Sequence, residues 1–136
     1  MFVDQAMTAH PIVAFPTTKI RDALQLMLEA RVRHLPIVQG KVLVGIVSMH
    51  DLRALIPRNL AEFSHPEGLQ HALEQPVRSI MNVAPVTVLA NVELKKAVDS
   101  MVDHQLDALP VVEPVSMKLV GILSYVDALR VARAFL

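Results

Sequence analysis

The chain contains one sequence unit twice, and this duplication constrains its fold more than any other feature. In the first half of the unit, a shift of 74 positions places these residues on identical ones in the second copy: Val3, Met7, Pro11, Ala23, Met27, Leu35, Pro36 and Val38. In the second half, a shift of 76 positions does the same for Leu43, Val44, Gly45, Ile46, Ser48 and Asp51. The two additional residues fall between two apolar runs, where a hairpin turn can accommodate them. A repeat of this length indicates two related structural units.

Each copy is predicted to contain an amphipathic helix. Apolar residues recur at i, i+3, i+4, i+7 and i+8, which is the spacing of one buried helical face. The residues on this face are Ile20, Ala23, Leu24, Met27 and Leu28 in the first copy and Leu94, Ala97, Val98, Met101 and Val102 in the second. Thr17 and Asn91 stand before these helices, and both are residue types that cap helix N-termini well.

Two short apolar runs follow each helix, and in the first copy they are residues 35–38 and 42–47. Gln39 and Gly40 separate them, so we expect a strand pair. A second helix should start near Ser48 and end at Ile56, before Pro57. The expected fold class is α/β, with two β-α-β-β-α units that pack together because a copy of about 55 residues cannot easily bury its own core. The expected division is 1–56 for the first repeat, 57–75 for a polar linker with a short helix over 66–74, and 76–136 for the second repeat.

Composition and charge exclude several classes of protein. Hydrophobic residues make up 53% of the chain and charged residues 19%, which indicates a globular protein. The 13 basic and 13 acidic residues cancel and form no basic run, so we expect no binding to nucleic acid. The longest apolar run is too short to span a membrane, and the N-terminus lacks a secretory signal, which favours the cytoplasm.

No catalytic or metal site is expected. The chain has no cysteine, and its six histidines show no tight ligand spacing. Gly-x-Ser-x-Gly, Gly-x-Gly-x-x-Gly and P-loop motifs do not occur. We therefore expect a protein that is not an enzyme and that holds no resident cofactor.

The repeated Gly-Ile-x-Ser-x-x-Asp stretch has a structural and a functional interpretation. In each copy a serine is followed three residues later by an aspartate: Ser48 by Asp51, and Ser124 by Asp127. Structurally, this is nearly a capping box at a helix start, and the preceding glycine would allow the strand and helix to pack closely. Functionally, a helix N-terminus offers amides to a phosphate, the serine can donate to phosphate oxygen, and the aspartate can accept from two ribose hydroxyls.

The whole repeated pattern resembles a known family. Met-x-x-x-Pro, an amphipathic helix, Leu-Pro-[Ile/Val]-Val and Val-Gly-Ile-x-Ser-x-x-Asp together resemble the CBS domain, named after cystathionine β-synthase. Two in tandem resemble a Bateman module, and the resemblance covers the chain except the linker. It implies two pseudo-symmetric CBS-type units that form a regulatory module. The module would bind AMP, ADP or ATP in clefts between the repeats, associate as a homodimer, and act on another protein, unless the chain is a fragment of something larger.

The resemblance also implies roles for individual residues. Asp51 and Asp127 would hold the ribose, and Ser48 and Ser124 would contact phosphate. The adenine pocket would be formed by Ile12, Val13, Val86, Thr87 and Ala108. Thr87 matches the hydroxyl residue often found on the family's first strand, whereas Val13 departs from it, which removes one polar contact from the first copy.

The two copies differ in charge. Residues 1–56 carry six basic and four acidic residues, whereas residues 76–136 carry six of each. Arg33, His34 and His50 of the first copy align with Asp107, Ala108 and Val126 of the second. A phosphate chain should prefer the basic copy, so these three are further candidates for phosphate contacts and should favour ATP or ADP there. If the copies exchange strands to build each cleft, the assignment to Asp51 or Asp127 could swap.

Two alternatives stay open. The ligand could instead be S-adenosylmethionine, NAD, a cyclic dinucleotide or a metal ion, and a ligand without phosphate would not need Arg33 and His34. Otherwise the chain is a purely structural dimerisation module in which Ser-x-x-Asp is only a cap. The apolar C-terminal helix, over residues 128–136, fits a dimer interface and a helix that closes its own core equally well.

Overall fold

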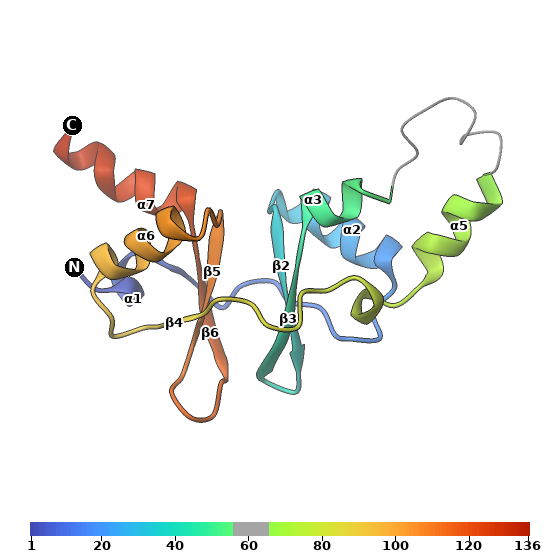
Figure 1. The fold of residues 1–136 in the computed structure, drawn as a ribbon, viewed down its shortest axis with the longest axis horizontal. Helices are drawn as coiled ribbons and strands as arrows, with labels where there is room; N and C mark the ends of the chain where they lie inside the picture. Colours follow the sequence, from blue (N-terminus) through green and yellow to red (C-terminus); the bar gives the residue numbers. More distant parts are fainter. Residues whose placement is uncertain (56–65) are drawn as a thin grey trace. The chain divides into compact units, whose positions relative to one another are not determined.

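The computed structural model describes residues 1–55 and 66–136, and the chain separates into two compact units (Figure 1). Unit 1 consists of Met1–Pro11, Gly40–Leu43 and Ala84–Leu136. Unit 2 consists of Ile12–Gln39 and Val44–Val83. The expected helix end at Ile56, and the boundary between repeat and linker that follows it, lie outside the described residues.

Unit 1 is a mixed sheet with its own helices. Its strands are β1 (Thr8–Ala9), β4 (Val88–Leu89), β5 (Ala108–Val112) and β6 (Leu119–Ser124), in the order β1-β6-β5-β4. Strand β6 is antiparallel to β1 and β5, whereas β4 is parallel to β5. The helices are α1 (Val3–Ala6), α6 (Leu94–Asp103) and α7 (Tyr125–Ala132), followed by the 3-10 turn η2 (Arg133–Phe135). They bury a core of Val3, Leu94, Ala97, Met101, Leu109, Val111 and Leu123.

Unit 2 repeats this plan with fewer paired residues. Strands β2 (His34–Gln39) and β3 (Val42–Ser48, with Val44 onward in this unit) form a two-stranded sheet. Single bridges flank it: Ala14 pairs in parallel with Ile37, and Asn82 pairs antiparallel with Ile46. The helices are α2 (Ile20–Ala30), α3 (Met49–Arg53), α5 (Pro66–Glu74) and the 3-10 turn η1 (Val77–Ser79). Helix α5 occupies the range in which the sequence predicted a short helix.

Each unit contains a segment from the other sequence repeat. In unit 1, Thr8 of the first repeat pairs with Ile122 of the second. In unit 2, Asn82 of the second repeat pairs with Ile46 of the first. Figure 1 shows the blue segment with α1 beside α6 and α7, and the yellow-green segment after α5 beside β3. The two repeats therefore exchange strands, and the compact units are not contiguous stretches of sequence. The exchanged segments are residues 1–11, which lie in unit 1, and residues 76–83, which lie in unit 2.

Helices α2 and α6 bury the face that the periodicity predicts, except at its C-terminal end. Ile20, Ala23 and Met27 are buried in α2, and the aligned residues are buried in α6. Leu28 and Val102, which close the predicted face, are exposed instead. Burial of an Ile or Met side chain is worth about 1.5–3 kcal/mol, so these faces hold each helix in its unit.

The predicted caps Thr17 and Asn91 were wrong. The N-caps are Lys19 and Glu93, and neither side chain makes a capping hydrogen bond. Main-chain carbonyls distant in the sequence supply the acceptors instead. Ile20 N donates to Gln75 O at 2.9 Å, and Leu94 N donates to Met1 O at 2.8 Å. A main-chain carbonyl from a distant segment thus satisfies an amide that a side-chain cap would otherwise serve.

Candidate functional site

In both units, the Ser-x-x-Asp sequence forms the turn from a strand into a helix. Ser48 lies in extended backbone at the end of β3, and its Oγ accepts a hydrogen bond from Asp51 N at 3.0 Å. The Asp51 carboxylate in turn accepts one from Ser48 N at 2.9 Å. Ser124 and Asp127 make the same two bonds, at 3.2 and 2.9 Å, between β6 and α7. Both turns are complete capping boxes, as the structural interpretation predicted.

The turn from strand to helix already uses some of the backbone amides that a phosphate could bind. In unit 2 the amide of Met49 donates to Arg33 O at 2.8 Å, and the amide of Asp51 is bonded to the serine. In unit 1 the amide of Tyr125 donates to Asp107 O at 2.8 Å. Two of the first three helical amides are therefore occupied in each unit. In unit 2 this leaves the Ser48 hydroxyl and the basic side chains as the main donors for a phosphate, whereas in unit 1 the Ser124 hydroxyl donates to Asp127.

The predicted site residues of unit 1 gather at one end of its sheet. Ala108 lies opposite Ser124 in the antiparallel pair of β5 and β6. Strand β4 runs parallel to β5, so Val86 and Thr87, just before β4, lie toward that same end. The adenine-pocket candidates of the second repeat are therefore placed beside its Ser-x-x-Asp turn. Val86 is exposed, Thr87 is half-buried and Ala108 is buried.

Unit 2 holds the corresponding residues of the first repeat. Ile12 and Val13 directly precede Ala14, which pairs in parallel with β2. Arg33 contacts the helix start through its carbonyl, and His34 begins β2. His50 lies in the first turn of α3, and the side chains of Arg33 and His50 are exposed. All three basic candidates thus belong to the unit that contains Ser48 and Asp51.

The two aspartates have different surroundings. Asp127 is 4% exposed, whereas Asp51 is half-buried. Besides the Ser124 amide, Asp127 accepts hydrogen bonds from Ser124 Oγ at 3.0 Å and from Thr8 Oγ1 at 3.4 Å. Arg130, one helical turn further on, donates to Asp127 Oδ1 at 3.0 Å in an ion pair. The Thr8 contact could not be predicted from the sequence, because Thr8 belongs to the exchanged segment.

The repeated glycine before each serine does not serve the close packing of strand and helix that the sequence suggested. A Cβ on Gly121 would lie 2.5 Å from Met7 Sδ and 2.9 Å from Thr8 O. A Cβ on Gly45 would lie 2.7 Å from Met81 Sδ and 3.0 Å from Asn82 O. The atoms that require glycine therefore belong to the exchanged segment, and not to the following helix.

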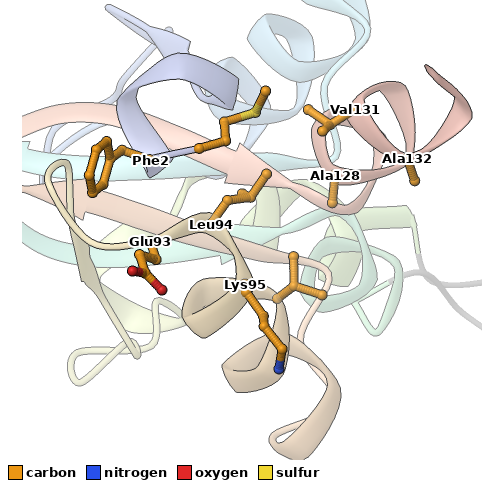
Figure 2. Close-up of a pocket in the computed structure, with 9 residues that line it drawn as sticks. Phe2, Glu93, Leu94, Lys95, Ala128, Val131 and Ala132 are labelled. Atoms are coloured by element: carbon orange, nitrogen blue, oxygen red, sulfur yellow. The ribbon is translucent and has the colours of Figure 1, made fainter. Parts of the chain in front are cut away.

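Unit 1 also contains a pocket of about 420 Å³ that the sequence did not predict (Figure 2). It lies between the N-terminal segment, α6 and α7, and its lining is Met1, Phe2, Glu93, Leu94, Lys95, Val98, Ala128, Val131 and Ala132. The only indication of this pocket in the sequence is the helical spacing of the apolar residues in α7. The lining shares no residue with the predicted ligand site.

Two further properties bear on the class of protein. Within residues 1–55 and 66–136, no three His, Asp or Glu side chains gather as a metal site would require. In the same part of the chain, no helix combines the length and the apolar character needed to cross a membrane.

The fold and the repeated turn define a tandem pair of small α/β domains. The family model of the CBS domain matches residues 3–58 and again residues 77–134. The chain belongs to the CBS domain family, as a tandem pair.

Solved structures support this assignment over nearly the full chain. The crystal structure of CBSX2 in complex with AMP, a protein of Arabidopsis thaliana, has a TM-score of 0.82 and 29% identity and covers 98% of this chain and 97% of that one. A structure described as a putative acetoin utilization protein (AcuB) from Vibrio cholerae has a TM-score of 0.81 and 33% identity, over 99% of this chain and 92% of that one.

One relative is considerably longer than this chain. MJ1225 of Methanocaldococcus jannaschii, an uncharacterized protein, is 27% identical over 125 residues, which are 88% of this chain and 44% of that protein. Its crystal structure has a TM-score of 0.85. The chain therefore spans less than half the length of this relative. The family model that matches, that of the CBS domain, does not indicate a catalytic family.

Proposed function

We propose that the chain is a regulatory module that senses an adenosine nucleotide, AMP, ADP or ATP, at its Ser-x-x-Asp turns. Asp51 and Asp127 accept from ribose hydroxyls, and Ser48 and Ser124 donate to phosphate. Binding favours one conformation of the module, and a partner protein responds to that conformation. The module itself catalyses no reaction.

One observation carries this proposal. The carboxylate of Asp51 lies at a strand end beside Ser48, in the same unit as the exposed basic side chains of Arg33 and His50. A carboxylate for the ribose and cations for the phosphate are the two chemistries that a nucleoside phosphate needs. The similarity to CBSX2, which was crystallised with AMP, adds support from outside the chain.

Thermal unfolding with a ligand panel tests the proposal. The panel contains AMP, ADP, ATP, NAD and S-adenosylmethionine, and the variants are Asp51→Asn and Asp127→Asn. Asparagine keeps an oxygen that can accept from the serine amide, so the cap survives while the charge is lost. A ligand at one hundred times its Kd should add about 2.7 kcal/mol of stability. For a chain of this length that corresponds to a rise in Tm of roughly 10 °C.

The matched control is Asp103→Asn, which removes an exposed carboxylate from the end of α6. We expect Asp103→Asn to keep the full shift with AMP, ADP or ATP, and Asp51→Asn to lose most of it. A shift with NAD or S-adenosylmethionine alone would replace the proposed ligand. Equal loss in both aspartate variants would contradict the expectation that the basic unit binds more tightly.

A second function is favoured by the completeness of the capping boxes, which close without any ligand. In that case the chain is a structural dimerisation module. Asp51→Ala, which removes the acceptor for the Ser48 amide, would then lower Tm by the same amount with and without nucleotide, and no member of the panel would raise Tm.

We further propose that the module acts as a homodimer in the cytoplasm. Leu129 is 61% exposed and Phe135 82% exposed, so apolar side chains near the C-terminal helix are available to a second copy. Sedimentation of the wild type and of Leu129→Glu tests this. A monomeric wild type would contradict it.

A further inference from the structure

The two ribose-binding aspartates differ in how much of their hydrogen-bonding capacity is free. An ionised carboxylate has about four acceptor positions, two on each oxygen. Asp127 uses four: Oδ2 accepts from the amide and the hydroxyl of Ser124, and Oδ1 accepts from Thr8 and Arg130. Within residues 1–55 and 66–136, Asp51 accepts one, from the Ser48 amide. Asp51 can therefore take two ribose hydroxyls directly, whereas Asp127 cannot take them without releasing a donor.

The difference lies in the residues around the turn. Arg130 aligns with Ala54, which has no group that could reach Asp51. Thr8 aligns with Asn82, and the serine and aspartate are the same in both copies. The saturation of Asp127 is thus a property of the second copy, and it would be invisible in the Ser-x-x-Asp motif alone.

Arg130 is the charged donor of the four, and it can leave at low cost. The Ser124 amide is part of the cap, and in the proposed function the Ser124 hydroxyl turns to the phosphate. The Arg130 side chain is 58% exposed, whereas the Asp127 side chain is 5% exposed. An exposed guanidinium regains water when it leaves, so its ion pair is weak. Departure of Arg130 frees one position on Oδ1 of the buried carboxylate, and departure of the Ser124 hydroxyl frees one on Oδ2. The two hydroxyls of a ribose then supply the replacement donors that a buried carboxylate needs.

We propose that Arg130 is a built-in competitor for the ribose at Asp127. This inference rests on the proposed function. With Arg130 in place, the first nucleotide binds at Asp51, and the position at Asp127 fills at higher nucleotide concentration, after Arg130 has moved away. The module then responds to two concentration ranges of the same ligand.

Isothermal titration with AMP tests the competitor directly. The variants are Arg130→Met, Arg130→Met with Asp127→Asn, and the control Arg133→Met. Arg133 is exposed one turn further along and forms no ion pair within residues 1–55 and 66–136. Both Met variants remove one positive charge, which by itself should weaken the binding of an anion. Arg130→Met should nevertheless tighten the second binding event by about tenfold, the effect of losing one charge-assisted hydrogen bond.

A gain-of-competitor variant provides an independent readout. Ala54→Arg places an arginine one turn after Asp51, at an exposed position. It should weaken the first binding event, although it adds a positive charge. This readout stays available if Arg130→Met destabilises the fold.

The outcomes separate the two proposals. Suppose that the wild type binds AMP, that Asp51→Asn does not, and that Arg130→Met and Arg133→Met bind AMP with equal affinity. This result overturns the competitor and leaves the nucleotide sensor intact. Binding that is weaker in Arg130→Met than in Arg133→Met also overturns it, because Arg130 would then contact the ligand. Two AMP sites of equal affinity in the wild type would likewise overturn the competitor. Absence of AMP binding in every variant, the wild type included, overturns both proposals.

Discussion

At the residue scale, the motif glycines have the least freedom to change. Gly121 and Gly45 each lie under a methionine sulfur and a main-chain carbonyl of the exchanged segment. Alanine at either position would force that segment away from the strand, and overpacking of this kind typically costs about 1–3 kcal/mol.

We therefore expect Gly121→Ala and Gly45→Ala to lower the free energy of unfolding by about 1–3 kcal/mol in urea titration. The matched control is Gly68→Ala in α5, where an added Cβ meets nothing within 4 Å. Because alanine is the better helix former, this change should be stabilising by about 0.5–1 kcal/mol. Equal effects at all three glycines would contradict the packing explanation.

The sequence predicted the capping boxes correctly because all of their atoms lie within four consecutive residues. It could not predict that Thr8 and Arg130 saturate Asp127, since Thr8 lies 119 residues away from it. The same limit explains the wrong caps at Thr17 and Asn91. Helices α2 and α6 take their acceptors from Gln75 and Met1, which no local pattern indicates.

At the element scale, α5 is attached to α2 by charge as well as by packing. Glu74, at the end of α5, forms ion pairs with Lys19, at 2.7 Å, and with Arg21. The hydrogen bond from Lys19, together with the positive charges of Arg21 and Lys19, holds the pKa of Glu74 below its usual value. A carboxylate with a lowered pKa stabilises the folded state when it is ionised.

This stabilisation should be fully present above the ordinary glutamate pKa and should disappear as the pH falls through the lowered value. We expect Glu74→Gln to unfold at a slightly lower temperature than the wild type at pH 7. The two Tm values should converge in acid, where the wild-type carboxyl is protonated. They should also converge at 1 M salt, because exposed ion pairs are screened there. A difference that does not change with pH would show that Glu74 acts by packing and not by charge.

At the scale of the whole molecule, the exchange of segments decides which pieces of the chain can fold. The fragment 1–75 corresponds to the first repeat with its linker, but it lacks residues 76–83. Those residues bring Val77 into the core of unit 2 and pair Asn82 with Ile46. The fragment 12–83 contains every segment assigned to unit 2.

We therefore expect fragment 12–83 to show cooperative thermal unfolding by circular dichroism, and fragment 1–75 to show a weaker transition or none. A fragment of this size has little stability to spare, so the loss of one buried valine and a paired segment is decisive. A transition of 1–75 at the same temperature as that of 12–83 would contradict the exchange. The duplication itself could not settle this point, because Met7 and Met81 are identical and either could pack on either glycine.

The exchange also imposes an order on the folding of the nascent chain. Unit 2 has all of its parts once residue 83 has been synthesised, whereas the strand around Thr8 waits for β6. At about 5–20 residues per second, that wait lasts on the order of ten seconds. During it Val3, which is fully buried in the finished protein, has no core to enter. The N-terminal segment is therefore the part of the new chain on which a chaperone has longest to act.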